Sequence, residues 1–152
     1  MIGGITYLKQ KIMPVWILYA LISCLFAGLT SVIAKFGLKN VPSDLALAIR
    51  TTVVFGLVWI NAIAFRHTLH LSSFTKKDLI FLSISGLTTT LSWIFYYRAI
   101  KIGDVSVVAS IDKASLVITI FLAFFFLNEP LSPKLLIGAG LITAGTLVLV
   151  FA

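Results

Sequence analysis

Two adjacent charged residues, Asp112 and Lys113, interrupt an otherwise apolar stretch of the chain, residues 105–127. If this stretch is a membrane-spanning helix, each unpaired charge near its centre costs about 2.5 to 3.5 kcal/mol, so both side chains should face protein or water. Ser115 and Thr119 follow at helical spacing and fall on the same face as Asp112. A carboxylate in such a place can load and release protons. The structural alternative is a fixed ion pair, either between Asp112 and Lys113 or with a cation from the same end of the molecule.

Hydroxyl groups form a second polar face within residues 79–100. At about 100° per residue they fall on one narrow stripe, whose members are Ser85, Thr88, Thr89, Ser92 and Tyr96. Such hydroxyls can bond to their own helix or to a neighbouring helix, whereas a continuous stripe can also line a wet path through a membrane. Trp93 lies beside the stripe and is the aromatic residue that we expect to contact a bound solute, with plain packing as the alternative.

Two cations lie just inside the ends of apolar runs. Arg50 lies near the start of residues 45–65, where its guanidinium could bind an anionic group or extend to the lipid headgroups. Lys35 follows the end of residues 14–34 and has the same two interpretations. Both residues therefore belong to the candidate site.

The apolar runs of the sequence supply five helices to hold these residues. Each run approaches the roughly 20 residues that a helix needs to cross a hydrocarbon layer about 30 Å thick. The runs are residues 14–34, 45–65, 79–100, 105–127 and 135–152. Backbone groups inside lipid must be bonded internally, and the alternating segments of a membrane β-barrel are not visible. We therefore predict an all-α fold, a polytopic membrane protein whose residues 1–152 form a single domain, a bundle of five transmembrane helices.

Composition narrows the function further. The chain is 60% hydrophobic and 11% charged, with a formal net charge of +7. Its lysines and arginines are spread along helix ends instead of gathered in one patch, so we expect contact with anionic membrane lipid and no nucleic-acid partner. No nucleophile and base set and no metal-ligand cluster is visible, so we expect neither an enzyme nor a metal or cofactor site.

Positive charge is almost evenly divided between the two sides of the membrane. Side A, where the first helix would begin, carries Lys9, Lys11, Arg66, Lys76, Lys77 and Lys134. Side B carries Lys35, Lys39, Arg50, Arg98 and Lys101. Because an excess of lysine and arginine in short loops sets orientation, this balance permits insertion both ways up. The alternative is a single orientation with side A in the cytoplasm, set by the adjacent Lys76 and Lys77.

Small residues in the last run offer a surface for close helix packing. Gly138, Gly140, Ala144 and Gly145 recur at spacings of four and seven residues, which lets another helix approach. The partner helix can belong to the same chain or to a second copy.

From about Trp16 onward the chain resembles one repeat of the EamA family, in the drug/metabolite transporter superfamily. The resemblance depends on the order and spacing of several short motifs, which are Ala27-Gly28 with Lys35, then Arg50, then Tyr97-Arg98-Ala99-Ile100 before Gly103, then Glu129, and finally Gly138-Ala139-Gly140 through Gly145. Glu129 matches a recurrent family glutamate, although it precedes Pro130 at a helix exit, where capping or a loop salt bridge is an alternative role. The chain has Asp112-Lys113 where the fourth helix of the family often has proline.

The resemblance implies a multi-pass protein of a bacterial or archaeal inner membrane. Many members of the family carry two such repeats, and an odd number of helices in each makes the second repeat inverted. A single repeat that builds the same pathway must then pair with a second copy in antiparallel orientation. Small multidrug resistance proteins, which are similar to this superfamily, also work as inverted pairs.

The first hypothesis is a secondary transporter that exports a small, anionic or zwitterionic, amino-acid-like metabolite. It would work by alternating access as an antiparallel homodimer, with proton coupling through Asp112. The alternatives are a non-transporting membrane subunit that stabilises or regulates a partner, and a drug exporter like the small multidrug resistance proteins.

Overall fold

The computed structural model describes residues 14–151, which form helices and no strand. The helices are α1 (Val15–Gly37), α2 (Ser43–Ala64), the 3-10 helix η1 (His67–Ser73), α3 (Lys76–Ile102), α4 (Val105–Lys113), α5 (Ser115–Leu127) and α6 (Pro133–Phe151). The helices α1, α2, α3 and α6, together with the joint span of α4 and α5, give five segments long and apolar enough to cross a membrane. The predicted all-α fold with five spans is confirmed.

Residues at the helix ends compensate for backbone groups that lack a hydrogen-bond partner within the helix. The Thr75 hydroxyl accepts a hydrogen bond from the Asp78 N–H at 3.3 Å, and the Asp78 carboxylate accepts one from the Thr75 N–H at 3.0 Å. This capping box starts α3 at Lys76, earlier than the predicted residue 79. Pro133 begins α6, where no N–H is required. Asn128 adopts the left-handed φ of 54° that ends α5.

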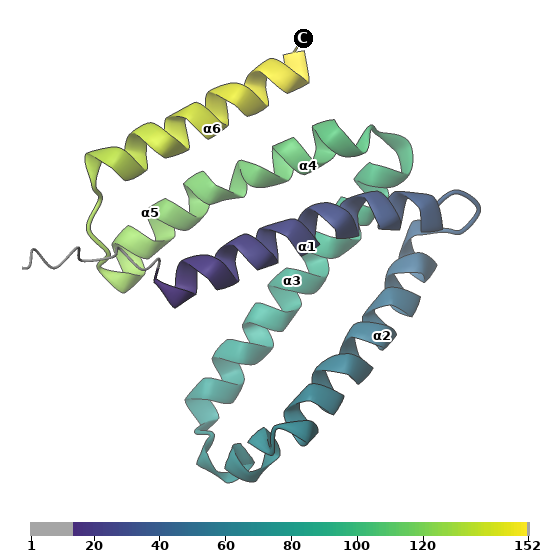
Figure 1. Cartoon of the computed structure of the whole chain (residues 1–152), viewed down its shortest axis with the longest axis vertical. Coiled ribbons are helices and arrows are strands. Elements are labelled where there is room, and N and C mark those ends of the chain that lie inside the picture. Colours follow the sequence, from purple (N-terminus) through teal and green to yellow (C-terminus); the bar gives the residue numbers. More distant parts are fainter. Residues whose placement is uncertain (1–13, 152) are drawn as a thin grey trace, which may run out of the picture.

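Successive spans run in opposite directions, as Figure 1 shows. There α1 lies between a pair formed by α2 and α3 and a layer formed by α4, α5 and α6. The ends of the described chain therefore lie on opposite sides, with α1 beginning on side A and α6 ending on side B. Lys9 and Lys11, which the sequence places on side A, and Ala152 lie outside the described residues.

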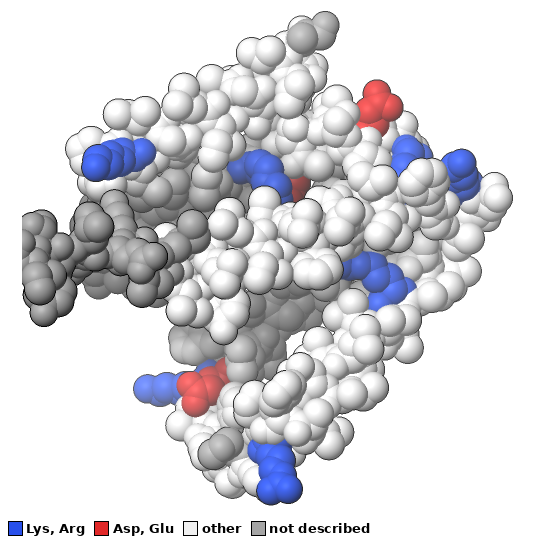
Figure 2. Space-filling view, in the orientation of Figure 1, with Lys and Arg blue, Asp and Glu red and all other residues white. Residues whose placement is uncertain are grey.

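Most large apolar side chains point outward. Phe126, for example, is 78% exposed and Phe151 is 82% exposed. In water such a surface would drive aggregation, but in a membrane it is the surface that lipid covers. Figure 2 shows that most charged side chains visible in that view lie near the ends of the helices, which leaves broad uncharged surfaces between them.

Buried side chains gather at the side-B ends of α1, α2 and α3. Leu38, Leu47, Tyr97 and Ile100 form one cluster, here called the side-B core. Ile100 is fully buried and Leu38 is 1% exposed. In contrast, every residue from 76 to 91 is exposed in the single chain, and this segment is here called the exposed half of α3.

Lysine side chains fasten the side-B core from two directions. The Lys35 ammonium, from α1, donates to the carbonyl oxygens of Ile100 at 2.6 Å and Gly103 at 2.9 Å, at the end of α3. The Lys101 ammonium, from α3, donates to carbonyl oxygens of Leu38, Lys39 and Val41, just beyond α1. The last carbonyls of a helix lack partners of their own, so each lysine completes the other's helix end.

An ion pair joins the same end of α2 to α3. The Arg98 guanidinium donates to both carboxylate oxygens of Asp44, at 3.1 and 2.9 Å. Asp44 lies in the first turn of α2, where a negative charge also favours the helix dipole. The cations of side B are therefore largely engaged in closing this end.

Candidate functional site

A cavity of about 820 Å³ lies where α1, α2, α3 and α4 meet. Cavities of about 300 to 1,000 Å³ are typical of sites for small molecules. The predicted site residues that line it are Arg50, Ser92, Trp93, Tyr96, Asp112 and Lys113. In Figure 2 positive and negative charge occur together in the hollow beside α1, away from the helix ends. The structure thus brings the charged pair of the fourth span together with the side-B half of the α3 stripe.

The fourth span is interrupted at Ala114, directly after the charged pair. The Ala114 N–H donates to the Ile111 carbonyl at 2.9 Å, three residues back, where a continuous helix would use Ser110, four residues back. The predicted single helix over residues 105–127 is therefore two helices, α4 and α5, within one span. Breaks of this kind inside a membrane occur where the backbone lines a cavity or is buried in protein.

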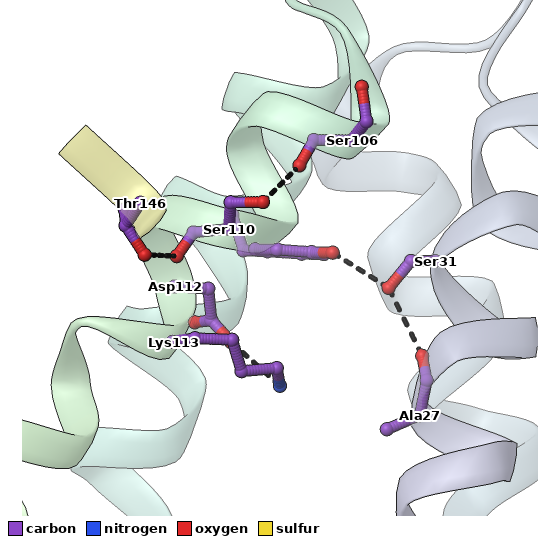
Figure 3. A network of polar contacts seen from close by, with 8 residues as sticks. Ala27, Ser31, Ser106, Ser110, Asp112, Lys113 and Thr146 are labelled. Carbon is purple, nitrogen blue, oxygen red and sulfur yellow. Dashed lines mark hydrogen bonds and ion pairs between the residues drawn. The ribbon is translucent and has the colours of Figure 1, made fainter. Parts of the chain in front are cut away.

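A threonine from another span supplies the missing partner. The Thr146 hydroxyl of α6 lies 3.1 Å from the Ser110 carbonyl oxygen and 2.9 Å from the Ile142 carbonyl oxygen of its own helix (Figure 3). Thr146 is 8% exposed, so this bond is shielded from lipid and water. The sequence analysis missed Thr146, since a hydroxyl that reaches across helices cannot be told from one that bonds its own.

Asp112 and Lys113 both point into the space between α4 and α1 in Figure 3. The Lys113 ammonium lies 3.7 Å from an Asp112 carboxylate oxygen, and their side chains are 62% and 42% exposed in the single chain. The ion pair offered as the structural alternative is therefore present, but it is long and open to the cavity. No other salt bridge reaches Asp112 within residues 14–151.

A hydrogen-bonded chain connects α3 to α1 across the same cavity. The Tyr96 hydroxyl donates to the Ser31 hydroxyl oxygen at 2.7 Å, and Ser31 in turn donates to the Ala27 carbonyl at 3.1 Å (Figure 3). Tyr96 thus holds α3 against α1 and also lines the cavity. This bridge was not predicted, because the sequence gives no signal that Ser31 faces α3.

Arg50 extends from α2 over two aromatic rings of α3. Its guanidinium carbon lies 4.4 Å from the Trp93 ring centroid and 5.6 Å from the Tyr97 ring centroid. Stacking of this kind is worth about 0.5 to 2 kcal/mol, more where water is excluded. The guanidinium is therefore held at the cavity wall and is half-buried there.

The other predicted pathway residues lie outside the cavity lining. Thr88 and Thr89 donate to carbonyl oxygens one turn back on α3, as Thr119 does to Ser115 on α5. These residues, together with Ser85 and Ser115, are exposed in the single chain. Lys35 is occupied by the end of α3, as described above. The carboxylate of Glu129, beyond α5, makes no salt bridge within the described part of the chain.

The wall formed by α1 was largely missed by sequence reasoning. Apart from Val32, its lining residues are small or hydroxylated, and they include Ala27, Gly28, Thr30 and Ser31. A signal existed, since small and hydroxyl residues alternate with large apolar ones there. It could not be distinguished from ordinary helix packing without knowing which helices are neighbours.

The small residues of α6 do not form its contact with α4. Ala139 and Thr146 are the buried residues of α6 and lie on one face. At about 100° per residue, Gly138 and Gly145 fall on one flank of that face and Gly140 and Ala144 on the other. No atom of a neighbouring helix lies within 4 Å of where a Cβ would be at these three glycines. Their role in packing stays a prediction.

Five apolar spans, four of which line a cavity that holds charged and hydroxyl groups, define an integral, multi-pass membrane protein with room for a small solute. The EamA-like transporter family matches residues 14–151, and the chain belongs to this family. The resemblance seen in the sequence is confirmed. The protein is therefore a membrane transporter, with a small-molecule substrate and membrane lipid as its partners.

A curated relative agrees with this assignment. It is a protein of Sinorhizobium sp. described as an uncharacterized transporter in the cobO 3' region, 38% identical over 134 residues. The aligned part covers 88% of this chain and 95% of that protein. No solved structure matches the chain.

Proposed function

We propose that the protein is a secondary transporter that exports a small anionic or zwitterionic metabolite across a bacterial or archaeal inner membrane. One observation carries the proposal. The cavity of about 820 Å³ combines Arg50, Asp112 and Lys113 with aromatic and hydroxyl groups, between spans that are otherwise apolar. Charged groups are costly in a membrane unless they bind a partner, an ion or a substrate, so their convergence on one solute-sized space favours transport.

We propose further that two copies work as an antiparallel homodimer. The near balance of lysine and arginine between the two sides permits both orientations. The exposed half of α3 carries a hydroxyl face that is open in the single chain, and a second copy would cover it. The relative from Sinorhizobium sp. is also short, since 134 residues cover 95% of it. Gly138, Gly140, Ala144 and Gly145 are candidate positions for contact between copies.

Proton coupling through Asp112 is the sharpest part of the proposal. The break at Ala114 places this carboxylate at the junction of α4 and α5, beside Lys113 and open to the cavity. Movement of one half-span relative to the other would change the surroundings of Asp112 during alternating access. A proton taken up on one side could then be released on the other.

Asp112→Asn tests the coupling. We expect the variant to lose proton flux driven by solute gradients in proteoliposomes, while it keeps its helicity and its elution volume in size-exclusion chromatography. A pH-sensitive dye inside the vesicles reports the flux across a panel of amino acids and carboxylates. Asp104→Asn is the matched control, because that exposed carboxylate lies outside the cavity and its loss should leave flux unchanged. Flux at the wild-type level in Asp112→Asn would remove Asp112 from the mechanism.

Single cysteines test the antiparallel dimer. Cys24 is the only cysteine of the chain, so Cys24→Ala gives a background without thiols. Ser73→Cys, on side A, should then react with a membrane-impermeant maleimide from both faces of the membrane, half from each. Asp104→Cys, on side B, should behave in the same way. Reaction from one face alone would contradict the antiparallel pair, and obligate co-purification of a different chain would favour a subunit role.

A further inference from the structure

Arg50 differs from the other half-buried cations of side B in having no hydrogen-bond partner within residues 14–151. Lys35 and Lys101 donate to backbone carbonyls, and the exposed Arg98 donates to Asp44. Arg50 contacts aromatic rings instead. A guanidinium stacked on a ring keeps its N–H groups available in its own plane, where they fit a carboxylate in a two-point contact.

The charges around the cavity leave Arg50 uncompensated. The charged residues that line the cavity are Asp112, which is acidic, and Lys113 and Arg50, which are basic. Asp112 and Lys113 are adjacent and lie 3.7 Å apart, so they largely neutralise each other. One positive charge remains, at the guanidinium. A bound molecule with a single negative charge would balance it, whereas a neutral or cationic solute would leave it unpaired.

A second, apolar cavity begins on the other side of Arg50. It has a volume of about 370 Å³ and lies between α1, α2 and α3. Thr30, Ala34, Arg50 and Tyr97 line both cavities and so lie between them, and Arg50 is the only charged residue of the four. The remaining wall of the smaller cavity is almost entirely aliphatic, with Ile33, Val41 and Ile49 among its side chains. The guanidinium thus lies between a larger space that contains hydroxyl and charged groups and a smaller one that is almost entirely apolar.

We infer that Arg50 binds the carboxylate of an organic monoanion whose hydrocarbon part occupies the smaller cavity. Any further polar groups of the molecule then face the hydroxyls of the larger cavity. The inference rests on the proposed function and narrows it, because it selects carboxylates with an apolar portion over amino-acid zwitterions. It also gives Arg50 the role of substrate-binding residue and makes Trp93 a spectroscopic reporter of occupancy.

The test measures binding in detergent, apart from transport. In a Trp16→Phe and Trp59→Phe background, Trp93 is the remaining tryptophan, since the chain has three. Hexanoate, hexanamide and hexylamine are all straight chains of six carbon atoms and differ in charge, and none absorbs where tryptophan emits. Hexanoate should change Trp93 fluorescence in a saturable way. Hexanamide should bind with an affinity at least about tenfold lower, because it lacks the charge-assisted contact.

Variants at Arg50 assign the contact. Arg50→Gln should weaken hexanoate by about tenfold or more and leave hexanamide unchanged, because only the charge is lost. Arg50→Lys keeps the charge without the planar fork and should fall between the two, which preserves the test if Arg50→Gln does not fold. Lys39→Gln is the matched control: this exposed cation of the same end stacks only on Phe36 and should bind hexanoate like the parent. Equal affinity for hexanoate and hexanamide, or parental affinity in a folded Arg50→Gln, would overturn the inference.

An anionic lipid headgroup is the other source of a negative charge at this depth. Repeating the titration in nanodiscs of phosphatidylcholine, with and without phosphatidylglycerol, separates the two. A hexanoate affinity that is the same in both kinds of nanodisc supports the inference. If hexanoate no longer binds when phosphatidylglycerol is present, Arg50 is a lipid-binding residue and the inference is overturned. Flux of labelled solutes into proteoliposomes tests the carrier separately. If hexanoate binds but no solute is transported, the carrier is excluded and the Arg50 site remains. If hexylamine alone is transported and hexanoate does not bind, the carrier remains and the Arg50 site is excluded.

Discussion

The two halves of α3 differ sharply although they belong to one continuous helix. At its side-B end, Tyr97 and Ile100 are buried in the side-B core, and Lys101 is bonded to backbone carbonyls beyond α1. Residues 76–91, towards side A, are exposed throughout, and their hydroxyls bond only to their own helix. One end of the repeat is therefore fastened, and the other is free to meet a partner or to move.

The difference shows that a membrane protein can keep one end of a helix tightly packed while the other end stays open to a partner or to movement. Apolar side chains gain little from packing against protein instead of lipid, so a fixed end needs close packing and polar bonds. The side-B core has both. The candidate cavity begins where that core ends, next to Trp93 and Tyr96, so the site is supported on one side by the most rigid part of the chain.

The largest expected effect comes from emptying the side-B core. Ile100→Ala should lower the free energy of unfolding by about 2 kcal/mol, the low end of the range for soluble cores, because mainly the packing part of the loss remains in a membrane. Ile84→Ala, in the exposed half of α3, should have an effect near zero. Unfolding by SDS in mixed micelles, followed by circular dichroism, measures both. Equal losses at the two positions would mean that the halves of α3 are equally packed, as in a tight dimer.

A smaller loss is expected when one lysine cap is removed. Lys101→Met keeps the length of the side chain and leaves the carbonyls of Leu38, Lys39 and Val41 without their donor, at a cost of about 1.5 kcal/mol. Lys39→Met removes an exposed lysine of the same end, which makes no hydrogen bond through its ammonium among the described residues, and should cost nothing measurable. The same unfolding titration compares them. A Lys101→Met variant as stable as its control would show that packing alone closes this end.

The smallest expected effect distinguishes two threonines. Thr146→Val removes the hydroxyl that reaches the Ser110 carbonyl across helices and should cost about 1 kcal/mol. Thr89→Val removes a hydroxyl that bonds only to Ser85 of its own helix, and the β-branched shape is kept. Its stability should match the parent. If Thr89→Val proves the more destabilising of the two, the Thr89 hydroxyl bonds across helices in the assembled protein and not only to its own helix.

The fold was readable from the sequence because a hydrocarbon layer dictates it. Apolar runs of bilayer length leave no other structure. The starts of α3 and α6 were placed at residues 79 and 135 instead of 76 and 133, because hydrophobicity alone does not register the Thr75 capping box or Pro133. The break at Ala114 was not readable. Nothing in the residues around it forbids a helix, and it depends on Thr146, which is distant in the sequence.

The site was predictable only where its residues are chemically conspicuous. Asp112, Lys113 and Arg50 were found because charges inside a membrane need a reason. The α3 stripe was predicted along the whole helix, since periodicity marks a polar face and cannot tell which part of it faces α1 in the single chain. The bonds from Lys35 to the end of α3 were not predicted, because the sequence cannot show that this end lies opposite it.

The contact between Thr146 and Ser110 restricts how the protein can rearrange. If α6 moved away from α4, a carbonyl oxygen in the middle of the hydrocarbon would lose its donor, with no water to replace it. These two helices should therefore travel as one body, with α5 swinging at Ala114, where α4 ends. Alternating exposure of a bound solute would then come from sliding of that body past α1 and α3, which Tyr96 and Ser31 hold to each other.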